Sequence, residues 1–324
     1  MENYENKTVV VTGGGSGIGR EIAMQVGKRG AYVYVTDIHT EWGRETEKLM
    51  ADAGIKGTYI EHDVTKEESW DAMIGQVLKE RGTVDYLFNN AGVMLRARPL
   101  SKLTMKDWEW LEAVNVRGVL FGLRKFTDIM NKQEQGGVIC TTCSTASVAP
   151  FSCWAPYTVT KAASLRLCET YQSEANYFKN TKVRYAAVMP GVVDTQISNC
   201  ECYRPEEFRN PGEPLAPLAP TTPTDSIEGK ALGKITPKLA VERILKQLDY
   251  GYFYIYTHRD LTVGLMTEQF DAMMLNKPIV DQLVYDFGYY QKKLLRVMTP
   301  EQQKAFLAAI EEKKKTSATQ PHEE

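Results

Sequence analysis

Three side chains in the middle of the chain have the types and spacing needed to move a proton to or from an oxygen atom. Tyr157 and Lys161 stand four residues apart in a stretch with helical spacing, so we expect them on one helix face. Free tyrosine has a pKa of about 10, and a nearby ammonium group lowers it by favouring the phenolate. Ser144 ends the preceding predicted strand, where its hydroxyl can hold a carbonyl or alcohol oxygen. Taken alone, such a Tyr–Lys pair is usually a surface arrangement and such a serine a cap.

A second candidate site is the glycine-rich segment Thr12–Gly19 (TGGGSGIG), between a predicted strand and a predicted helix. Without Cβ atoms the backbone can turn tightly and approach a ligand, and the N-terminus of the next helix suits a pyrophosphate. The spacing is not the G-x-G-x-x-G fingerprint. A P-loop would need lysine after the last glycine, and a nucleophile elbow would need glycine at Ile18. The segment predicts a dinucleotide loop; a glycine-rich helix start without a ligand is the alternative.

Asp37 closes the second predicted strand, 18 residues after Gly19. A carboxylate at this point can accept hydrogen bonds from the adenosine ribose and repels a 2′-phosphate. Neither Arg nor Lys occupies positions 14, 15, 38 or 39. We therefore predict NAD(H) in preference to NADP(H). Without the glycine loop, Asp37 would be interpreted as a solvated strand-end or N-cap residue.

The elements that must position these residues follow from the alternation of short β-branched runs with helical patterns such as Glu67–Glu80. The predicted strands are Lys7–Thr12, Ala31–Thr36, Gly57–Glu61, Val84–Phe88, Val138–Cys143, Val183–Val188 and Tyr252–Thr257. Strands that are apolar on both faces and alternate with helices indicate a parallel sheet covered on each side. We predict an α/β fold, a Rossmann-like doubly wound sheet of about seven strands, with ligands at the carboxyl ends of the strands.

The alternation breaks at Ser198–Thr236, where six of the 14 prolines fall between Pro205 and Pro223. A segment this long without periodicity is typical of a lid or binding loop. A helix is expected at Pro237–Leu248, and the chain from Leu261 has helical spacing. We predict one catalytic domain over residues 1–260, with residues 198–236 as a substrate-binding lid. A helical C-terminal extension over 261–324 would end in a frayed charged tail.

Several separated motifs, in order and spacing, resemble those of the short-chain dehydrogenase/reductase family. Thr12–Gly19 is similar to the family's TGxxxGIG loop, and Asn89–Gly92 (NNAG) to the motif after its fourth strand. Ser144, Tyr157 and Lys161 reproduce the S…YxxxK pattern, with 13 residues from serine to tyrosine. The remaining matches are Asp63-Val64, Asn115, and Pro190-Gly191 followed by Thr195. The resemblance covers roughly Lys7 to Thr257.

This resemblance implies a role for each matching residue. Tyr157 would be the acid/base, Lys161 would lower its pKa and hold the nicotinamide ribose, and Ser144 would orient the substrate oxygen. Asn115 would support a water relay from Lys161 toward solvent. The implied cofactor-binding residues are Gly13, Ser16, Gly17, Ile18, Gly19, Asp37, Asp63, Val64, Asn90, Ala91, Gly92, Tyr157, Lys161, Pro190, Gly191, Val193 and Thr195. The implied cofactor is NAD, and no metal is required.

Composition excludes several other classes of protein. The 324 residues are 43% hydrophobic and 25% charged with a net charge of −2, as in an ordinary globular protein with no reason to bind nucleic acid or a membrane. No apolar run spans a bilayer, the N-terminus does not resemble a signal peptide, and six cysteines are too few for a disulfide scaffold. We therefore expect a cytoplasmic protein.

The spacing of the cysteines also allows the interpretation that they bind a metal ion or have a redox role. Cys140 and Cys143 have the spacing of half a zinc motif, and Cys200 and Cys202 could supply further ligands. No histidine accompanies them, and thiols in the strand Val138–Cys143 most simply pack as small hydrophobic groups. In the lid, Cys200 and Cys202 are expected to be more exposed to oxidation.

The substrate is predicted to be bulky and mainly apolar, because apolar residues mark both the lid and the approach to Tyr157. They are Phe208, Leu215, Leu218 and Ile227 in the lid, and Val148, Ala149, Phe151 and Trp154 on the approach; simple packing against the extension is the alternative. The tail is similar to that of extended family members, including hydroxysteroid dehydrogenases. A hydroxysteroid is the first choice of substrate, an aryl or terpenoid secondary alcohol the second, and a non-catalytic NAD-binding regulatory module the alternative of another class.

The resemblance also implies assembly. Family members usually form dimers or tetramers through the helices that correspond here to Lys106–Met130 and Ala155–Phe178. The second of these carries Leu165, Leu167, Tyr171 and Phe178, more apolar surface than one face against the sheet needs. We expect a homodimer or homotetramer.

Overall fold

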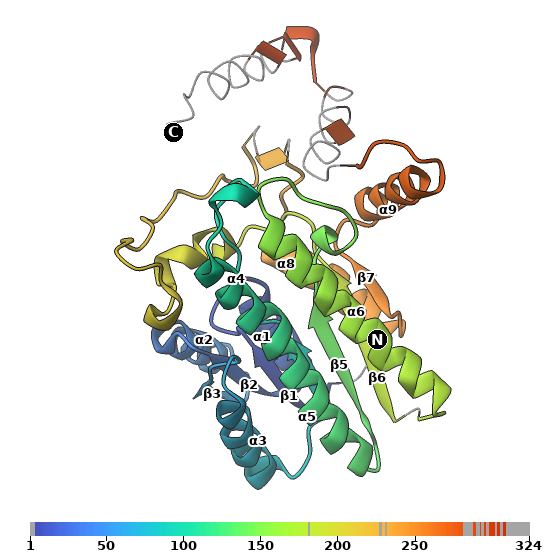
Figure 1. Ribbon diagram of the computed structural model, residues 1–324. Coiled ribbons are helices and arrows are strands. Elements are labelled where there is room, and N and C mark those ends of the chain that lie inside the picture. Colours follow the sequence, from blue (N-terminus) through green and yellow to red (C-terminus); the bar gives the residue numbers. More distant parts are fainter. Residues whose placement is uncertain are drawn as a thin grey trace.

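The computed structural model describes residues 4–180, 182–226, 229–230 and 232–280, with isolated positions between 288 and 308. A parallel sheet of seven strands, in the order β3-β2-β1-β4-β5-β6-β7, forms the centre of this part of the chain (Figure 1). The strands are β1 (Thr8–Thr12), β2 (Tyr32–Asp37), β3 (Gly57–Glu61), β4 (Tyr86–Asn89), β5 (Gly137–Thr142), β6 (Val183–Met189) and β7 (Tyr254–Tyr256). Because the order reverses direction between β1 and β4, a crevice opens at their carboxyl ends.

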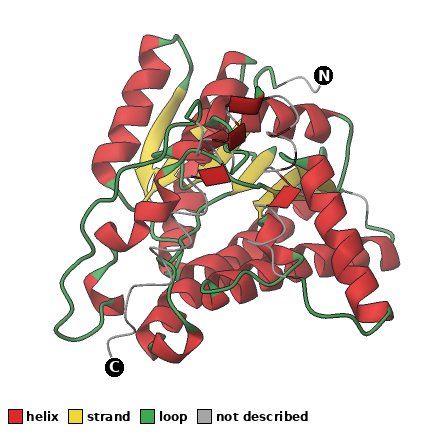
Figure 2. Ribbon diagram, turned by 90° about the horizontal axis from the view of Figure 1, so that it is seen from above, coloured by secondary structure: helices red, strands yellow, loops and turns green. Residues whose placement is uncertain are grey.

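Helices cover both faces of the sheet, as the view from above shows (Figure 2). They are α1 (Gly17–Lys28), α2 (Thr40–Asp52), α3 (Glu67–Arg81), α4 (Met105–Glu112), α5 (Val119–Lys132), α6 (Ala155–Tyr177), α8 (Pro237–Asp249) and α9 (Arg259–Met274). Alternate strand residues pack to opposite sides: Val10 belongs to the core under α3, α5 and α6, whereas Val9 and Val11 belong to the core under α1 and α8. This burial on both faces explains why the strands are continuous apolar runs.

The predicted α/β, Rossmann-like fold is confirmed, and each predicted strand differs from the observed one by no more than two residues at either end. The division into a catalytic domain and an extension stays a prediction. Ile227, most of the predicted extension beyond residue 280 and its charged tail lie outside the described residues. Within the part of the chain that is described, no helix combines the length and apolar character needed to cross a bilayer.

Two local departures from the expected elements matter for the site. The helix expected over Lys106–Met130 is interrupted by a π-helical turn, η2 (Ala113–Gly118), between α4 and α5. Such a turn takes a main-chain group out of the helical ladder and is often found at functional sites. The predicted lid is not irregular at its start, because it forms two short 3₁₀ helices, η4 (Gln196–Tyr203) and η5 (Glu206–Phe208). In Figure 1 these yellow turns lie beside α2 and α4.

Candidate active site

A cavity of about 640 Å³ lies along the carboxyl edge of the sheet. Residues at or just after the ends of the first six strands line it: Gly13, Asp37, Asp63, Asn90, Ser144 and Pro190. One end is bordered by Asp37 and Asp63, and the other by Ser144 and Tyr157. The cavity therefore joins the predicted nucleotide site to the predicted proton-transfer site.

The glycine loop is shaped for close approach to a ligand. Gly17 begins α1 with a φ of +51°, and a Cβ there would lie 2.9 Å from the side chain of Thr195. A Cβ on Gly19 would lie 2.1 Å from the carbonyl oxygen of Gly13, so no larger residue fits. Glycine is thus required where the loop folds against itself and against the Pro190–Thr195 segment, leaving the first N–H groups of α1 at the cavity.

Asp37 lines the cavity, but its carboxylate also has a structural role. Its Oδ2 atom accepts a hydrogen bond from the Gly15 N–H at 2.9 Å, and its Oδ1 atom accepts one from the His39 N–H at 2.9 Å. Each oxygen keeps a second lone pair for a ligand hydroxyl. The only cationic side chains among the described residues that line the cavity are Lys161 and Lys234. Asp37 therefore both fixes the glycine loop and supplies negative charge to its end of the cavity.

Hydrogen bonds between neighbouring strand ends hold the middle of the cavity floor. The Thr12 hydroxyl accepts from the N–H groups of Asn90 and Ala91 at 2.9 and 3.0 Å. The Asn90 side chain donates to the Thr12 carbonyl at 3.1 Å and accepts from the Thr142 hydroxyl at 3.1 Å. These contacts join β1, β4 and β5 at the switch point, so the NNAG segment is fixed before any ligand binds.

The three predicted proton-transfer residues come together at the other end. Tyr157 and Lys161 occupy successive turns of α6, and both are buried, at 8% and 2% exposure. The Lys161 Nζ atom lies 5.9 Å from the centre of the Tyr157 ring and donates to the Thr142 carbonyl at 2.9 Å. Ser144 begins the turn after β5, and its hydroxyl bonds Tyr157 as well as accepting from the Ala146 N–H at 3.1 Å. A substrate oxygen between Ser144 and Tyr157 would meet two hydroxyl donors.

In the protein without cofactor the pKa of Tyr157 is not lowered, and the expectation that Lys161 and a cationic nicotinamide together lower it stays a prediction. Burial raises the pKa of Tyr157 to about 12, and the hydrogen bond from Ser144 offsets this only in part. Burial also lowers the pKa of the Lys161 ammonium. Desolvation dominates because neither charged form faces water. Without cofactor, burial therefore favours the neutral phenol, which is the form that can give a proton to a substrate oxygen.

Asn115 lies behind the cavity wall rather than on it, within the π-helical turn and with no exposed surface. Its amide accepts from the Val93 N–H and donates to the Val93 carbonyl, both at 2.9 Å. Its own main-chain carbonyl, freed by the wide turn, accepts from the Ser164 hydroxyl at 2.7 Å. These bonds fix the chain after Gly92 against α6; the water relay stays a prediction.

The substrate end is apolar, as expected, but only some of the predicted residues form it. Phe151 and Trp154 line the cavity with their rings stacked at 4.4 Å, and Phe208 of the lid also lines the cavity. Leu215 and Leu218 are exposed at 41% and 63%, and do not line the cavity. Val148 and Ala149 pack toward the core instead. Trp110 and Met94, which the sequence did not single out, complete the apolar wall.

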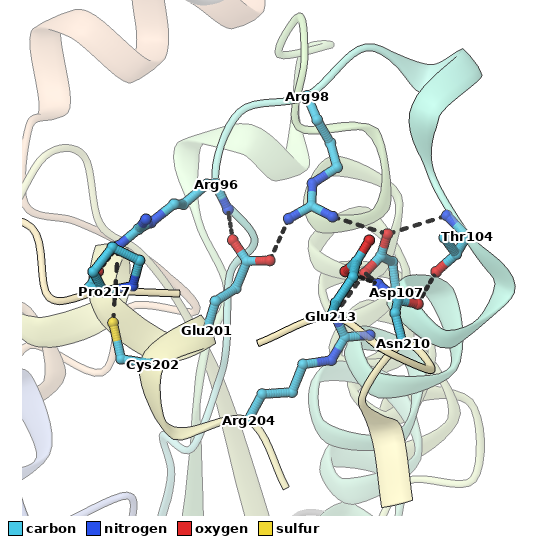
Figure 3. Close-up of polar contacts among 10 residues, drawn as sticks. All are labelled: Arg96, Arg98, Thr104, Asp107, Glu201, Cys202, Arg204, Asn210, Glu213 and Pro217. Atoms are coloured by element: carbon cyan, nitrogen blue, oxygen red, sulfur yellow. Dashed lines mark hydrogen bonds and ion pairs between the residues drawn. The ribbon is translucent and has the colours of Figure 1, made fainter. Parts of the chain in front are cut away.

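A buried network of charged side chains fastens the lid to the body of the protein (Figure 3). Asp107 of α4 has no exposed surface and accepts from Arg204 of the lid at 2.6 Å and from Arg98 at 3.2 Å. Arg98 also pairs with Glu201 of η4, and Asn210 accepts from the Thr104 hydroxyl at 2.6 Å. The charges alternate in sign, so each buried ion has an opposite neighbour.

One sequence prediction about the cysteines is confirmed, and one is wrong. Cys140 and Cys143 are buried in the core, as expected for small hydrophobic groups. Cys200 and Cys202 are half-buried rather than exposed, and burial raises the pKa of the Cys200 thiol to about 11, which disfavours the reactive thiolate. The exposed cysteine of the described chain is Cys153. No group of three or more potential metal ligands gathers among the described residues.

The structure brings nearly all of the predicted site residues to one cavity. Of the residues predicted for cofactor binding and catalysis, only Gly19 and Asn115 do not line it, and both support residues that do. Sequence reasoning missed Thr142, whose strand-end position was an available signal. It also missed four residues that line the cavity from three segments of the chain: His39 and Trp42, Tyr203, and Lys234. No motif or spacing in the sequence around these residues indicates a ligand site.

A doubly wound parallel sheet with a glycine loop, a strand-end carboxylate and a Ser–Tyr–Lys group in one cavity defines a dinucleotide-dependent oxidoreductase. The family described as "short chain dehydrogenase" matches residues 7–201. The chain belongs to this family of oxidoreductases.

Known relatives are moderately similar over most of the chain. A "CLA biosynthesis dehydrogenase/reductase" of Lactiplantibacillus plantarum is 26% identical over 260 residues, 80% of this chain and 90% of its own. A "3beta-hydroxysteroid dehydrogenase 1" of Eggerthella lenta is 31% identical over 66% of this chain and 80% of its own. A crystal structure of a short chain dehydrogenase/reductase from Burkholderia phymatum in complex with NAD superposes with a TM-score of 0.77 at 26% identity, covering 87% of this chain and 99% of that one.

Proposed function

We propose that this protein is an NAD(H)-dependent oxidoreductase that interconverts a secondary alcohol and a ketone on a bulky, mainly apolar substrate, with a hydroxysteroid as first candidate. The observation that carries the proposal is the shared cavity. A tightly folded glycine loop borders one end, and Ser144, Tyr157 and Lys161 lie beside an apolar wall at the other. The related hydroxysteroid dehydrogenase and the NAD complex of a related structure support it.

The residues present fit a dinucleotide. The glycine loop has no room for a Cβ at Gly19, α1 turns its free N–H groups toward the cavity, and Asp37 lies where a ribose hydroxyl can donate to it. Arg20 directly follows the glycine loop in the sequence. Its guanidinium donates a hydrogen bond to the Gly15 carbonyl and pairs with Glu45, and it does not line the cavity. A 2′-phosphate would therefore meet a carboxylate without a compensating cation, which favours NAD(H).

Tyr157 would act as the acid/base. In ketone reduction the neutral phenol donates its proton to the substrate oxygen, and Ser144 holds that oxygen by a hydrogen bond. When bound, the cofactor would supply or accept the hydride. In alcohol oxidation Tyr157 takes the alcohol proton, which requires its phenolate. Lys161, held by the Thr142 carbonyl, stabilises that phenolate by its charge.

The apolar wall supports a substrate with a large hydrocarbon body. Phe151 and Trp154 offer aromatic surface near Tyr157, and Trp110 and Phe208 add aromatic side chains to the cavity wall. A fused-ring steroid with one hydroxyl or keto group matches this distribution of polar and apolar surface. The stacked pair Phe151–Trp154 gives a specific reason to keep an aryl secondary alcohol as the second candidate, because aromatic rings pack favourably on such a pair.

The function can be tested with a panel of hydroxysteroids, ketosteroids and aryl carbinols, each incubated with NAD or NADH and followed by NADH absorbance. We expect turnover with a steroid or aryl substrate in the wild-type protein and none with Tyr157→Phe. Binding of NAD without turnover of any alcohol or ketone would favour the non-catalytic binding module instead.

We also propose a homodimer or homotetramer, although the surface first suggested for it is mostly used within the chain. Leu165 is buried, and Leu167 and Tyr171 pack against the core, so Phe178 and its neighbour Tyr177 are the exposed apolar residues at that end of α6. Light scattering at micromolar concentration should give two or four times the 36.6 kDa chain mass. A monomer would contradict the proposal.

A further inference from the structure

The lid segment Gln196–Phe208 lies along the whole length of the cavity rather than over its substrate end alone. It follows Thr195, which contacts the glycine loop. Cys200 lies close enough to influence the pKa of Tyr157, whereas Tyr203 borders the end of the cavity that Asp37 marks. One continuous segment therefore covers both the predicted substrate site and the predicted nucleotide site.

Tyr203 completes a cluster of three rings at the nucleotide end. Its ring centre lies 4.7 Å from that of Trp42 in α2 and 5.3 Å from that of His39, both in edge-on arrangements. His39 and Trp42 are themselves 4.5 Å apart. All three side chains are half-buried and line the cavity. Such rings offer apolar faces and edges to a planar base.

A second contact ties the lid to the same end of the cavity. Glu207 in η5 pairs with Lys66 at 3.2 Å, and Lys66 lies 3.7 Å from Asp63, which lines the cavity after β3. The lid thus touches the nucleotide end through Tyr203 on the β2–α2 side and through Glu207 on the β3–α3 side. The buried pairs of Arg204 and Glu201 hold the segment between the substrate end and these contacts (Figure 3).

We propose that the lid supplies Tyr203 as a contact for the adenosine half of the dinucleotide, so that the adenosine half alone holds the lid in its seated position and the cofactor exchanges only when the lid moves. This inference rests on the proposed dinucleotide function. Because the same segment carries Cys200, which lies close to Tyr157, closure at the nucleotide end also reaches the cavity wall beside Tyr157.

ADP-ribose tests this inference, because it carries the adenosine half and lacks nicotinamide. Its affinity is measured by calorimetry on the full chain, and lid closure by the rate of trypsin cleavage after the exposed Arg209. In the wild type, ADP-ribose should slow this cleavage. Tyr203→Ala should weaken ADP-ribose binding by roughly tenfold or more and abolish the protection, since contact between an aromatic ring and a base is lost.

Matched variants separate ring contact from general damage to the lid. Tyr203→Phe keeps the ring and should keep both affinity and protection, while Tyr203→Leu keeps an apolar side chain without the ring and should behave like Tyr203→Ala. Glu206→Ala changes an exposed position of the same segment and should have no effect. Circular dichroism and the thermal midpoint of each variant without ligand verify that it is folded.

The outcomes distinguish this inference from the proposed function. Equal ADP-ribose affinity and equal protection in wild type and Tyr203→Ala would overturn the role of Tyr203. If the wild type bound NAD but not ADP-ribose, the inference would fail and the proposed function would stand. If it bound neither, both would fail.

Discussion

The two ends of the cavity are built by different physical means. The nucleotide end is made of strand ends and the glycine loop, and main-chain hydrogen bonds such as those from Gly15 and His39 to Asp37 hold it. The wall around Ser144 and Tyr157 is completed by the lid, which also reaches the nucleotide end, and side-chain ion pairs between Asp107, Arg204 and Arg98 hold this lid in place. The first kind of site is rigid with the sheet. The second depends on buried charges that must be satisfied together, and a single substitution can release them.

The largest expected effect is on catalysis at the junction of the two ends. Tyr157→Phe removes one oxygen and should lower turnover by ~10²–10⁴-fold or more, as is typical for loss of an acid/base and an orienting group. At neutral pH, NAD(H) affinity should stay nearly unchanged, because the nucleotide end is untouched. Turnover assays with a verified substrate, together with calorimetric NAD binding, check both parts. Near-native activity would show that Tyr157 is not the acid/base.

Lys161→Ala serves as the contrasting variant. It should lower both turnover and NAD affinity, since Lys161 lies between the predicted nicotinamide and catalytic sites. If the two variants behaved alike in NAD affinity, the predicted ribose contact of Lys161 would be absent.

Breaking the ion network should cost stability. Asp107→Asn leaves the buried Arg204 without its charged partner, and removal of one member of a buried pair typically costs about 3–5 kcal/mol. Urea unfolding of the full chain should show this loss. Glu206→Gln, an exposed change on the same lid, is the control and should be neutral. A loss below about 1 kcal/mol for Asp107→Asn would mean that water replaces the pair.

The same carboxylate predicts an acid sensitivity. Burial raises the pKa of Asp107, but hydrogen bonds from the Thr104 N–H and Arg204, with the charge of Arg98, outweigh it and leave the pKa below its ordinary value. The group therefore stabilises the fold above the pKa it has in the unfolded chain. This stability is lost as the pH falls from that value toward the lowered one. Unfolding free energies measured across this range should fall more steeply in the wild type than in Asp107→Asn.

At the nucleotide end, cofactor preference should respond to Asp37. The wild type should prefer NAD over NADP by at least tenfold, about 1.4 kcal/mol. Asp37→Ala combined with Ile38→Arg should shift the preference toward NADP. Because Asp37 also holds Gly15 and His39, overall affinity should decrease as well. Calorimetry with both cofactors measures the two effects, and equal binding by the wild type would contradict the assignment of Asp37.

The smallest effect concerns the ionisation of Tyr157. Since burial, offset only in part by the hydrogen bond from Ser144, raises its pKa to about 12, the cofactor-free phenol should stay protonated throughout the neutral range. A cationic nicotinamide favours the phenolate, so NAD⁺ affinity should rise with pH above neutrality, whereas NADH affinity should not. Tyr157→Phe should make the NAD⁺ curve flat in this window. Parallel curves for wild type and variant would show that Tyr157 does not couple to the cofactor.

By itself, the sequence determined the features that depend on local chemistry. Apolar runs of β-branched residues specify buried strands, glycines at Gly13–Gly19 permit the tight loop, and the spacing of Tyr157 and Lys161 places both on one helix face. Parallel strands bring their carboxyl ends to one edge, so a cavity there could also be predicted.

Tertiary structure alone decided what depends on distant partners. Arg204 and Asp107 are 97 residues apart, and Arg98 and Glu201 are 103, so no local pattern reveals that they neutralise one another. The same is true of Tyr203 beside Trp42, and of the π-helical turn that carries Asn115 to Val93. The pKa of Tyr157 also required the structure, because it depends on how completely the folded chain excludes water from the phenol.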